Sequence, residues 1–117
     1  MGLYEQLQAR EARGNPVRVG LVGVGKFGTM FLAQTERIPG VHVVGVADLR
    51  VDVAKSNMVL AGWPADRIEA TSLAAALASG ETHVGDDAMA LIGFDGIDIV
   101  IECTGNPVVA VDHVLAA

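Results

Sequence analysis

The chain has 117 residues, enough for about one domain with a single core, and 51% of them are hydrophobic while only 4% are aromatic. Its formal net charge of −6 argues against nucleic-acid binding, which requires clustered lysines and arginines, and its single cysteine excludes a disulfide framework or a cysteine-based metal cluster. Because the first residues are charged and no apolar run approaches about 18 residues, we expect a soluble cytoplasmic protein without a membrane partner.

The first half of the chain alternates helical and strand patterns. Residues 2–13 predict a short amphipathic helix with Leu3, Tyr4 and Leu7 on one side, and we expect residues 1–16 to form an N-terminal helix and linker outside the main fold. Further on, the patterns predict a strand over 17–22, a helix over 26–38, a strand over 41–47 and a helix over 51–61. The apolar side of the helix at 26–38 carries Phe27, Met30, Phe31 and Ile38.

The second half of the chain is less regular. The segment "RIEA" at 67–70 is compatible with a short edge segment, and Ser72 and Gly80 predict the cap and the end of a small helix. We expect a short strand over 82–85 and a helix over 86–92, with Asp86 and Asp87 favourable at its start. Residues 97–103 predict a strand, and Asn106 with Pro107 predicts the start of a last helix.

This order of elements predicts an α/β fold of the Rossmann type: a parallel sheet in the strand order 3-2-1-4 with flanking helices, formed by residues 17–117. Two strands of the complete fold are missing, so the fourth strand would leave a very apolar edge unpaired. We therefore expect an incomplete dinucleotide-binding domain, truncated before its last strands, with the substrate and catalytic domain beyond residue 117.

Three glycines follow the first predicted strand in a G-x-G-x-x-G spacing, at Gly23, Gly25 and Gly28. In this pattern the first glycine permits a tight turn, the second lets a pyrophosphate approach the main chain, and the third lets the helix pack closely on the sheet. The amides near Lys26 and Phe27, at the positive end of that helix, would face the anion. The spacing alone is weak evidence in a chain with 14 glycines, but the strand before it and the helix after it favour a nucleotide site.

An acidic residue, Asp48, ends the second predicted strand 20 residues after Gly28, where a carboxylate can accept the ribose hydroxyls of an adenosine. Asp48 favours NAD, since a 2′-phosphate would meet a like charge, whereas Arg50 could pair with that phosphate. The choice between NAD(H) and NADP(H) therefore stays open. Val22 stands where enzymes that use S-adenosylmethionine usually carry an acidic residue, which disfavours a methyltransferase.

The turn after the fourth predicted strand would line the nicotinamide half of the cleft, through Thr104, Gly105 and Asn106. Cys103 is interpreted as a small core residue, and His42, His83 and His113 as structural or exposed residues, because their spacing fits no metal site. No acid–base pair for hydride transfer is visible. The catalytic residues are therefore unknown, and no metal is expected.

The segments "VRVGLVGVGKFGTMFLAQ", "GVADLR" and "IDIVIECTGNP" together resemble the N-terminal domain of homoserine-dehydrogenase-like NAD(P)-dependent oxidoreductases. The opening "LYEQLQAREARGNPVRVGLVGVGKFG" is similar to the subset with a C-terminal SAF domain, which includes the 1-deoxy-D-xylulose 5-phosphate reductoisomerase-like enzymes. The resemblance implies nucleotide binding through Gly23, Gly25, Lys26, Phe27 and Gly28, with Asp48 and Arg50 at the adenosine ribose. It also implies Thr104, Gly105 and Asn106 near the nicotinamide, and it favours NADPH.

The function expected from the sequence is the nucleotide-binding domain of an NAD(P)-dependent oxidoreductase. Hydride would pass between nicotinamide and a carbonyl or hydroxyl substrate held by the missing domain, so this fragment alone should be inactive. The alternative is a non-catalytic NAD(P)-sensing module on the same fold. The intact protein is expected to be a homo-oligomer.

Overall fold

A computed structural model describes residues 2–36 and 38–103 of the chain, and at Lys26 and Phe27 it describes the main chain only. The helices and strands are α1 (Leu3–Ala12), β1 (Val17–Val22), α2 (Lys26–Thr35), β2 (Val41–Ala47), α3 (Val51–Leu60), the 3₁₀-helix η1 (Ala65–Ile68), α4 (Leu73–Ser79), β3 (His83–Gly85), α5 (Ala88–Ile92) and β4 (Ile99–Glu102). The helix expected after Asn106 lies outside the described residues.

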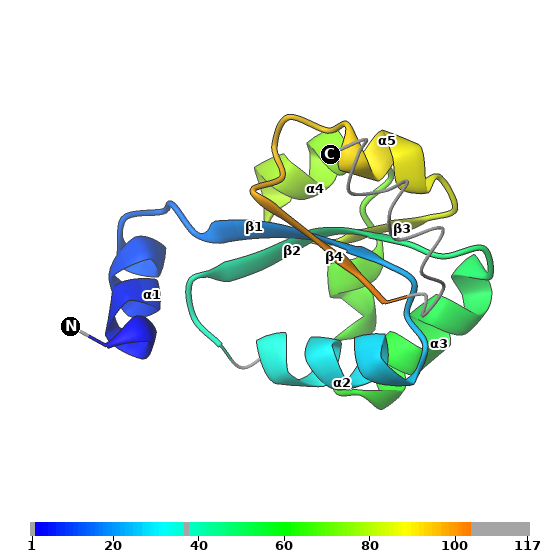
Figure 1. The fold of residues 1–117 in the computed structure, drawn as a ribbon, viewed down its shortest axis with the longest axis horizontal. Helices are drawn as coiled ribbons and strands as arrows, with labels where there is room; N and C mark the ends of the chain where they lie inside the picture. Colours follow the sequence, from blue (N-terminus) through cyan, green and yellow to red (C-terminus); the bar gives the residue numbers. More distant parts are fainter. Residues whose placement is uncertain (1, 37, 104–117) are drawn as a thin grey trace.

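The strands form one sheet in the order β3-β2-β1-β4, and every neighbouring pair is parallel. Helices α2 and α3 cover one face of this sheet, and α4 and α5 cover the other (Figure 1). The predicted α/β, Rossmann-like architecture and its strand order are therefore confirmed. Within the described residues, β4 pairs only with β1 and is the outer strand on its side of the sheet.

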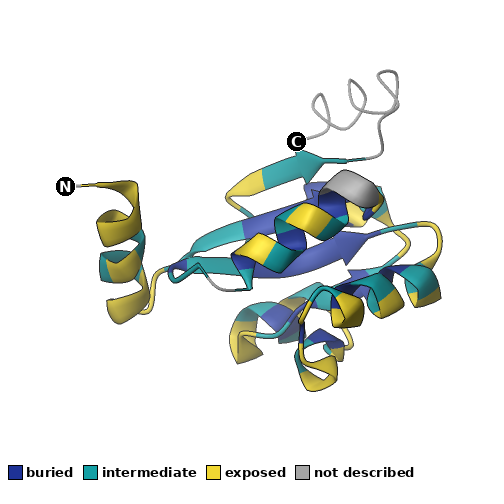
Figure 2. Ribbon diagram, turned by 90° about the horizontal axis from the view of Figure 1, so that it is seen from below, coloured by how far each residue is buried: buried dark blue, intermediate teal, exposed yellow. Residues whose placement is uncertain are grey.

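The two inner strands, β1 and β2, have the predicted bounds because their valine-rich runs are covered on both faces. Their first residues are partly exposed, and from Val19 in β1 and Val43 in β2 onward every residue is buried (Figure 2). Successive side chains point to opposite faces of a strand, so a strand that is buried on both faces must be apolar at consecutive positions.

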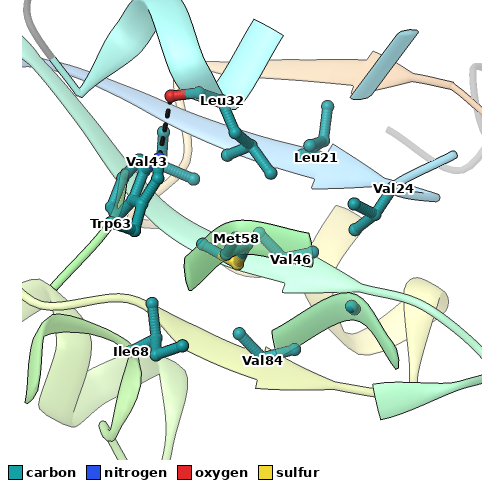
Figure 3. Close-up of a cluster of buried hydrophobic side chains, with 10 residues drawn as sticks. Leu21, Val24, Leu32, Val43, Val46, Met58, Trp63, Ile68 and Val84 are labelled. Atoms are coloured by element: carbon teal, nitrogen blue, oxygen red, sulfur yellow. Dashed lines mark hydrogen bonds between the residues drawn. The ribbon is translucent and has the colours of Figure 1, made fainter. Parts of the chain in front are cut away.

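The larger of two hydrophobic clusters lies between the sheet and α2 and α3, as Figure 3 shows in close-up. It consists of Leu21, Val24, Leu32, Val43, Val46, Ala54, Met58, Trp63, Ile68 and Val84. Trp63 brings a polar atom into this cluster, and its indole N–H donates to the Leu32 carbonyl at 2.8 Å. This hydrogen bond ties the segment after α3 to the middle of α2.

The smaller cluster lies on the opposite face, where Val22 and Ala47 meet Leu91 and Ile92 of α5. Two glycines that are paired across the strands, Gly20 in β1 and Gly45 in β2, make room there for Leu91. A Cβ atom at Gly45 would lie 2.5 Å from the Cδ1 atom of Leu91, and one at Gly20 would lie 3.2 Å from it. The paired glycines therefore let α5 pack closely on the centre of the sheet.

Several predicted segments differ from the structure. The segment 67–70 is not an edge segment: Pro64 starts the 3₁₀-helix η1, whose Ile68 is buried in the larger cluster. Helix α2 ends at Thr35 rather than at residue 38, because Ile38 precedes Pro39 and a residue in that position disfavours helical torsions. Strand β4 is also shorter than predicted, because Ile97 instead closes a turn with the Phe94 carbonyl.

The predicted apolar side of α2 was partly wrong. Met30 is 56% exposed, whereas Leu32 is completely buried. The third glycine of the motif, Gly28, lies one turn before Leu32, and both are buried against the sheet. The buried face of α2 is therefore the face on which Gly28 lets the main chain of the helix approach the sheet closely.

The N-terminal helix α1 stands at the end of the sheet where the strands begin (Figure 1). It has no buried residue, and its Leu3 and Tyr4 side chains are exposed. The main chain of α1 at Leu7 lies very close to Gly40. A Cβ atom built on Gly40 would overlap the Leu7 carbonyl. Among the described residues, no helix is both long enough and apolar enough to cross a membrane.

Candidate functional site

The candidate site lies at the carboxyl edge of the sheet, where the four strands end in register. Val22, the last residue of β1, is paired with Ala47 on one side and Glu102 on the other, and Ala47 is paired with Gly85. The residues that follow these strands therefore meet at one edge. In open parallel sheets this edge is where ligands bind.

The glycine motif forms the turn between β1 and α2. Gly23 has a φ of +80°, which favours glycine, and its N–H donates to the Ala47 carbonyl at 2.7 Å. Gly25 is exposed, and the nearest atom of the described residues that a Cβ there would meet is the Cys103 carbonyl oxygen at 3.9 Å. Gly28 is buried, and a Cβ there would lie 2.9 Å from the Gly23 carbonyl oxygen. The first and third glycines thus shape the turn, whereas the described residues do not crowd the second.

Helix α2 begins immediately after this turn, with Gly25 as its N-cap residue and no side-chain cap from the described part of the chain. The first amides of a helix lack partners within the helix and carry partial positive charge. Ser72 caps α4 and Asp87 caps α5 through their side chains, as their residue types predict, whereas α1 and α3, like α2, have no side-chain cap from the described residues. The start of α2 therefore offers main-chain donors to an anion at the carboxyl edge.

Asp48 lies directly beside the glycine turn. Its Oδ2 atom accepts the Val24 N–H and its Oδ1 atom accepts the Arg50 N–H, each at 2.9 Å. Its own N–H donates to the Gly85 carbonyl at 2.8 Å. Val24 and Asp48, 24 positions apart in the sequence, are thus held together by a hydrogen bond between the segments that follow β1 and β2.

Two partners of Asp48, Val24 and Gly85, were not among the sequence-predicted site residues. Val24 takes part through its main-chain N–H, while its side chain is buried in the larger cluster. Gly85 takes part through its carbonyl at the end of β3. Main-chain contacts of this kind have no residue-type signature, so no pattern in the sequence pointed to them.

Arg50 is exposed and is the N-cap residue of α3, two residues after Asp48. Its main-chain N–H is held by the Asp48 carboxylate. The structure thus places the main chain of Arg50 next to the carboxylate of Asp48.

On the other side of the turn, Cys103 follows β4 and its N–H donates to the Val22 carbonyl at 2.7 Å. Partial burial, and then the neighbouring charge of Glu102, raise the pKa of the Cys103 thiol, which disfavours the nucleophilic thiolate. A Cβ at Gly28 would lie 3.6 Å from the Cys103 Cβ. Cys103 thus packs against the glycine turn. The predicted nicotinamide-side residues Thr104, Gly105 and Asn106 lie outside the described residues, and so do the side chains of Lys26 and Phe27.

The described histidines make contacts with main-chain carbonyls away from the turn. His42 Nε2 lies 2.7 Å from the Glu81 carbonyl oxygen, and His83 Nδ1 lies 2.9 Å from that of Ala70. Burial lowers the pKa of His42, and the charges of Arg18 and Arg67 lower it further, against the opposite effect of the Glu81 carbonyl. Within residues 2–36 and 38–103, no three His, Cys, Asp or Glu side chains are grouped so that they could hold a metal ion.

A small pocket lies next to Asp48, between β2, β3 and the start of α5. Its lining includes Ala47, His83, Gly85 and Asp86, and its volume is about 100 Å³. Ligand pockets usually measure about 300–1,000 Å³, so this one is too small to enclose a nucleoside.

Searches with family models and among curated proteins found no match to this chain. The assignment of the site therefore rests on its geometry and on the motifs of the sequence.

Proposed function

We propose that the chain is the dinucleotide-binding domain of an NAD(P)-dependent oxidoreductase. The observation that carries this proposal is the juxtaposition of the start of α2, which has no side-chain cap from the described residues, with the Asp48 carboxylate, joined through the Val24 N–H. Anion donors and an acceptor for ribose hydroxyls thus stand side by side, as an adenosine joined to a pyrophosphate requires.

The surroundings of Gly25 are compatible with such a ligand. Among the described residues, a methyl group there would meet no atom closer than 3.9 Å, so crowding by these residues does not account for the glycine. A pyrophosphate that approaches the main chain does explain it. Gly23, Gly28 and the amides of Lys26 and Phe27 would complete the cradle, with Asp48 and Arg50 at the adenosine ribose.

The bound nicotinamide would supply the hydride chemistry, and the residues of this chain would bind and orient the dinucleotide. Thr104, Gly105 and Asn106 would lie near the nicotinamide. A carbonyl or hydroxyl substrate, and the residues that move its proton, would belong to a further part of the intact protein. A reductoisomerase-like or homoserine-dehydrogenase-like reaction is the form that the motif resemblance supports, in a cytoplasmic homo-oligomer.

Titration of the chain with NADH, NADPH and S-adenosylmethionine, followed by nicotinamide fluorescence and by thermal unfolding, tests this proposal. We expect binding of at least one dinucleotide and none of S-adenosylmethionine. A folded chain that binds only S-adenosylmethionine, or none of the three, would contradict it. An intact protein that binds a dinucleotide but never oxidises or reduces it would support the alternative, a non-catalytic sensing module.

A further inference from the structure

Asp48 connects three segments of the carboxyl edge. Its main chain is bonded to Gly85 at the end of β3, and its two carboxylate oxygens are bonded to Val24 after β1 and to Arg50 before α3. The hydrogen bond to Val24 is partly shielded from water, whereas the one to Arg50 is exposed. The side chain therefore already has a structural task before any ligand binds.

The contact with Val24 controls the position of the glycine turn. The Val24 side chain is 1% exposed and packs in the larger cluster, and the preceding N–H, that of Gly23, is bonded to Ala47. The turn is thus fastened to the end of β2 by two neighbouring N–H groups, and one of the two acceptors is a side chain. Gly25, the next residue, is the point at which α2 begins. A change at Asp48 would be transmitted over this short distance to the first amides of α2.

The same carboxylate retains capacity for a ligand. Two carboxylate oxygens offer about four acceptor positions, and the two main-chain donors occupy two of them. Two ribose hydroxyls could therefore be bound without releasing Val24. A serine or an alanine at this position could not replace both contacts, since neither has two acceptor atoms at that reach.

We propose that Asp48 is a positioning residue for the pyrophosphate turn, in addition to the ribose ligand of the proposed function on which this inference rests. It acts through the Val24 N–H and so aligns the first amides of α2 with the anion. In consequence, a substitution at Asp48 that removes the repulsion of a 2′-phosphate also weakens the pyrophosphate site. A variant changed only at Asp48 should therefore bind NAD(H) more weakly without a matching gain in its affinity for NADP(H).

Inorganic pyrophosphate is the probe that separates the two roles, because it has no ribose. If Asp48 acted on the ribose alone, Asp48→Ala would remove a negative charge near the anion and would tighten pyrophosphate binding. The positioning role predicts the opposite sign: we expect Asp48→Ala to bind pyrophosphate about three- to tenfold more weakly. Asp48→Asn, which keeps one acceptor oxygen, should be intermediate. Equal or tighter binding by Asp48→Ala would overturn the proposal.

Amide hydrogen exchange provides a readout that requires no ligand. In Asp48→Ala the Val24 amide should exchange at least about tenfold faster, while the amides of β1 remain protected, which also shows that the variant is folded. An unchanged Val24 amide would overturn the positioning role. Failure of the wild-type chain to bind either dinucleotide would instead contradict the proposed function, and the exchange measurement would still decide the role of Asp48 in the turn.

Discussion

The Cα of Gly28 faces the carbonyl oxygen of Gly23 so closely that a Cβ atom would lie 2.9 Å from it. The main chain of Gly23 thus leaves no room for a side chain at Gly28, so the third position of the motif must be glycine. This contact gives the two ends of the glycine turn a fixed spacing before any ligand is bound.

Gly28→Ala should therefore destabilise the fold and the site together. The added methyl group must displace a main-chain carbonyl, since no flexible side chain is there to move, and we expect a loss of about 1–3 kcal/mol in the free energy of unfolding. Urea denaturation measures this loss, and dinucleotide titration should show binding at least about tenfold weaker. Wild-type stability together with wild-type binding would show that the turn does not need this contact.

Gly25→Ala is the matched variant in the same turn. Because its methyl group would meet no atom of the described residues closer than 3.9 Å, it should cost less free energy of unfolding through crowding than Gly28→Ala. Dinucleotide binding should nevertheless fall by at least about tenfold, since the methyl group would occupy the approach of the pyrophosphate. Full binding by Gly25→Ala would place the ligand elsewhere. The comparison thus separates a glycine that main-chain crowding requires from one at which the described residues leave space for a methyl group.

Gly45→Ala tests the close packing of α5 on the sheet. The new Cβ would lie 2.5 Å from the Leu91 Cδ1 and the Leu73 Cδ2 atoms, so we expect a destabilisation of about 1–3 kcal/mol by denaturant unfolding. Part of this cost should disappear in a Leu91→Ala background, because the Leu91 Cδ1 methyl group is then absent and only the Leu73 Cδ2 methyl group remains close to the new Cβ. A double-mutant cycle with no coupling between positions 45 and 91 would be inconsistent with this contact.

His42 should make stability depend on pH. Burial lowers its pKa below the ordinary value of 6.5, so the unfolded chain takes up a proton at a higher pH than the folded chain does. The stability associated with the neutral ring is therefore present above about pH 6.5 and is lost as the pH falls through the lowered value. Urea midpoints at about pH 7.5 and about pH 5.5 should fall further for the wild type than for His42→Gln. Parallel losses in the two proteins would argue against a titrating His42.

The outer strand β4 should promote self-association. Ile99 is 49% exposed, and β4 is paired only with β1 among the described residues. Exposed apolar strand edges favour pairing with another chain, and a lysine at such an edge opposes it. Light scattering should show a mass that rises with protein concentration and a smaller rise for Ile99→Lys. A monomer over the whole concentration range would contradict this expectation.

The sequence by itself determined the fold class and most of the candidate site. The valine-rich runs at 17–22 and 41–47 have the bounds of β1 and β2, because strands covered on both faces are apolar at consecutive positions, as both are after their partly exposed first two residues. The alternation of strands with helices predicted the order 3-2-1-4, since parallel strands need helical crossovers. The placement of Gly23, Gly25 and Asp48 at one edge followed from that topology.

Only the tertiary structure decided which atoms join these elements. The contact between Asp48 and the Val24 N–H, and the fit of Leu91 over Gly20 and Gly45, depend on main-chain positions and on strand register. The buried face of α2 also depended on the tertiary structure: periodicity placed Met30 on it, whereas close packing at Gly28 places Leu32 there. Residue types report what a side chain can do, but distances between segments far apart in the chain are set by packing. The sequence therefore specified the components of the site, and the packed sheet specified how Asp48 holds them together.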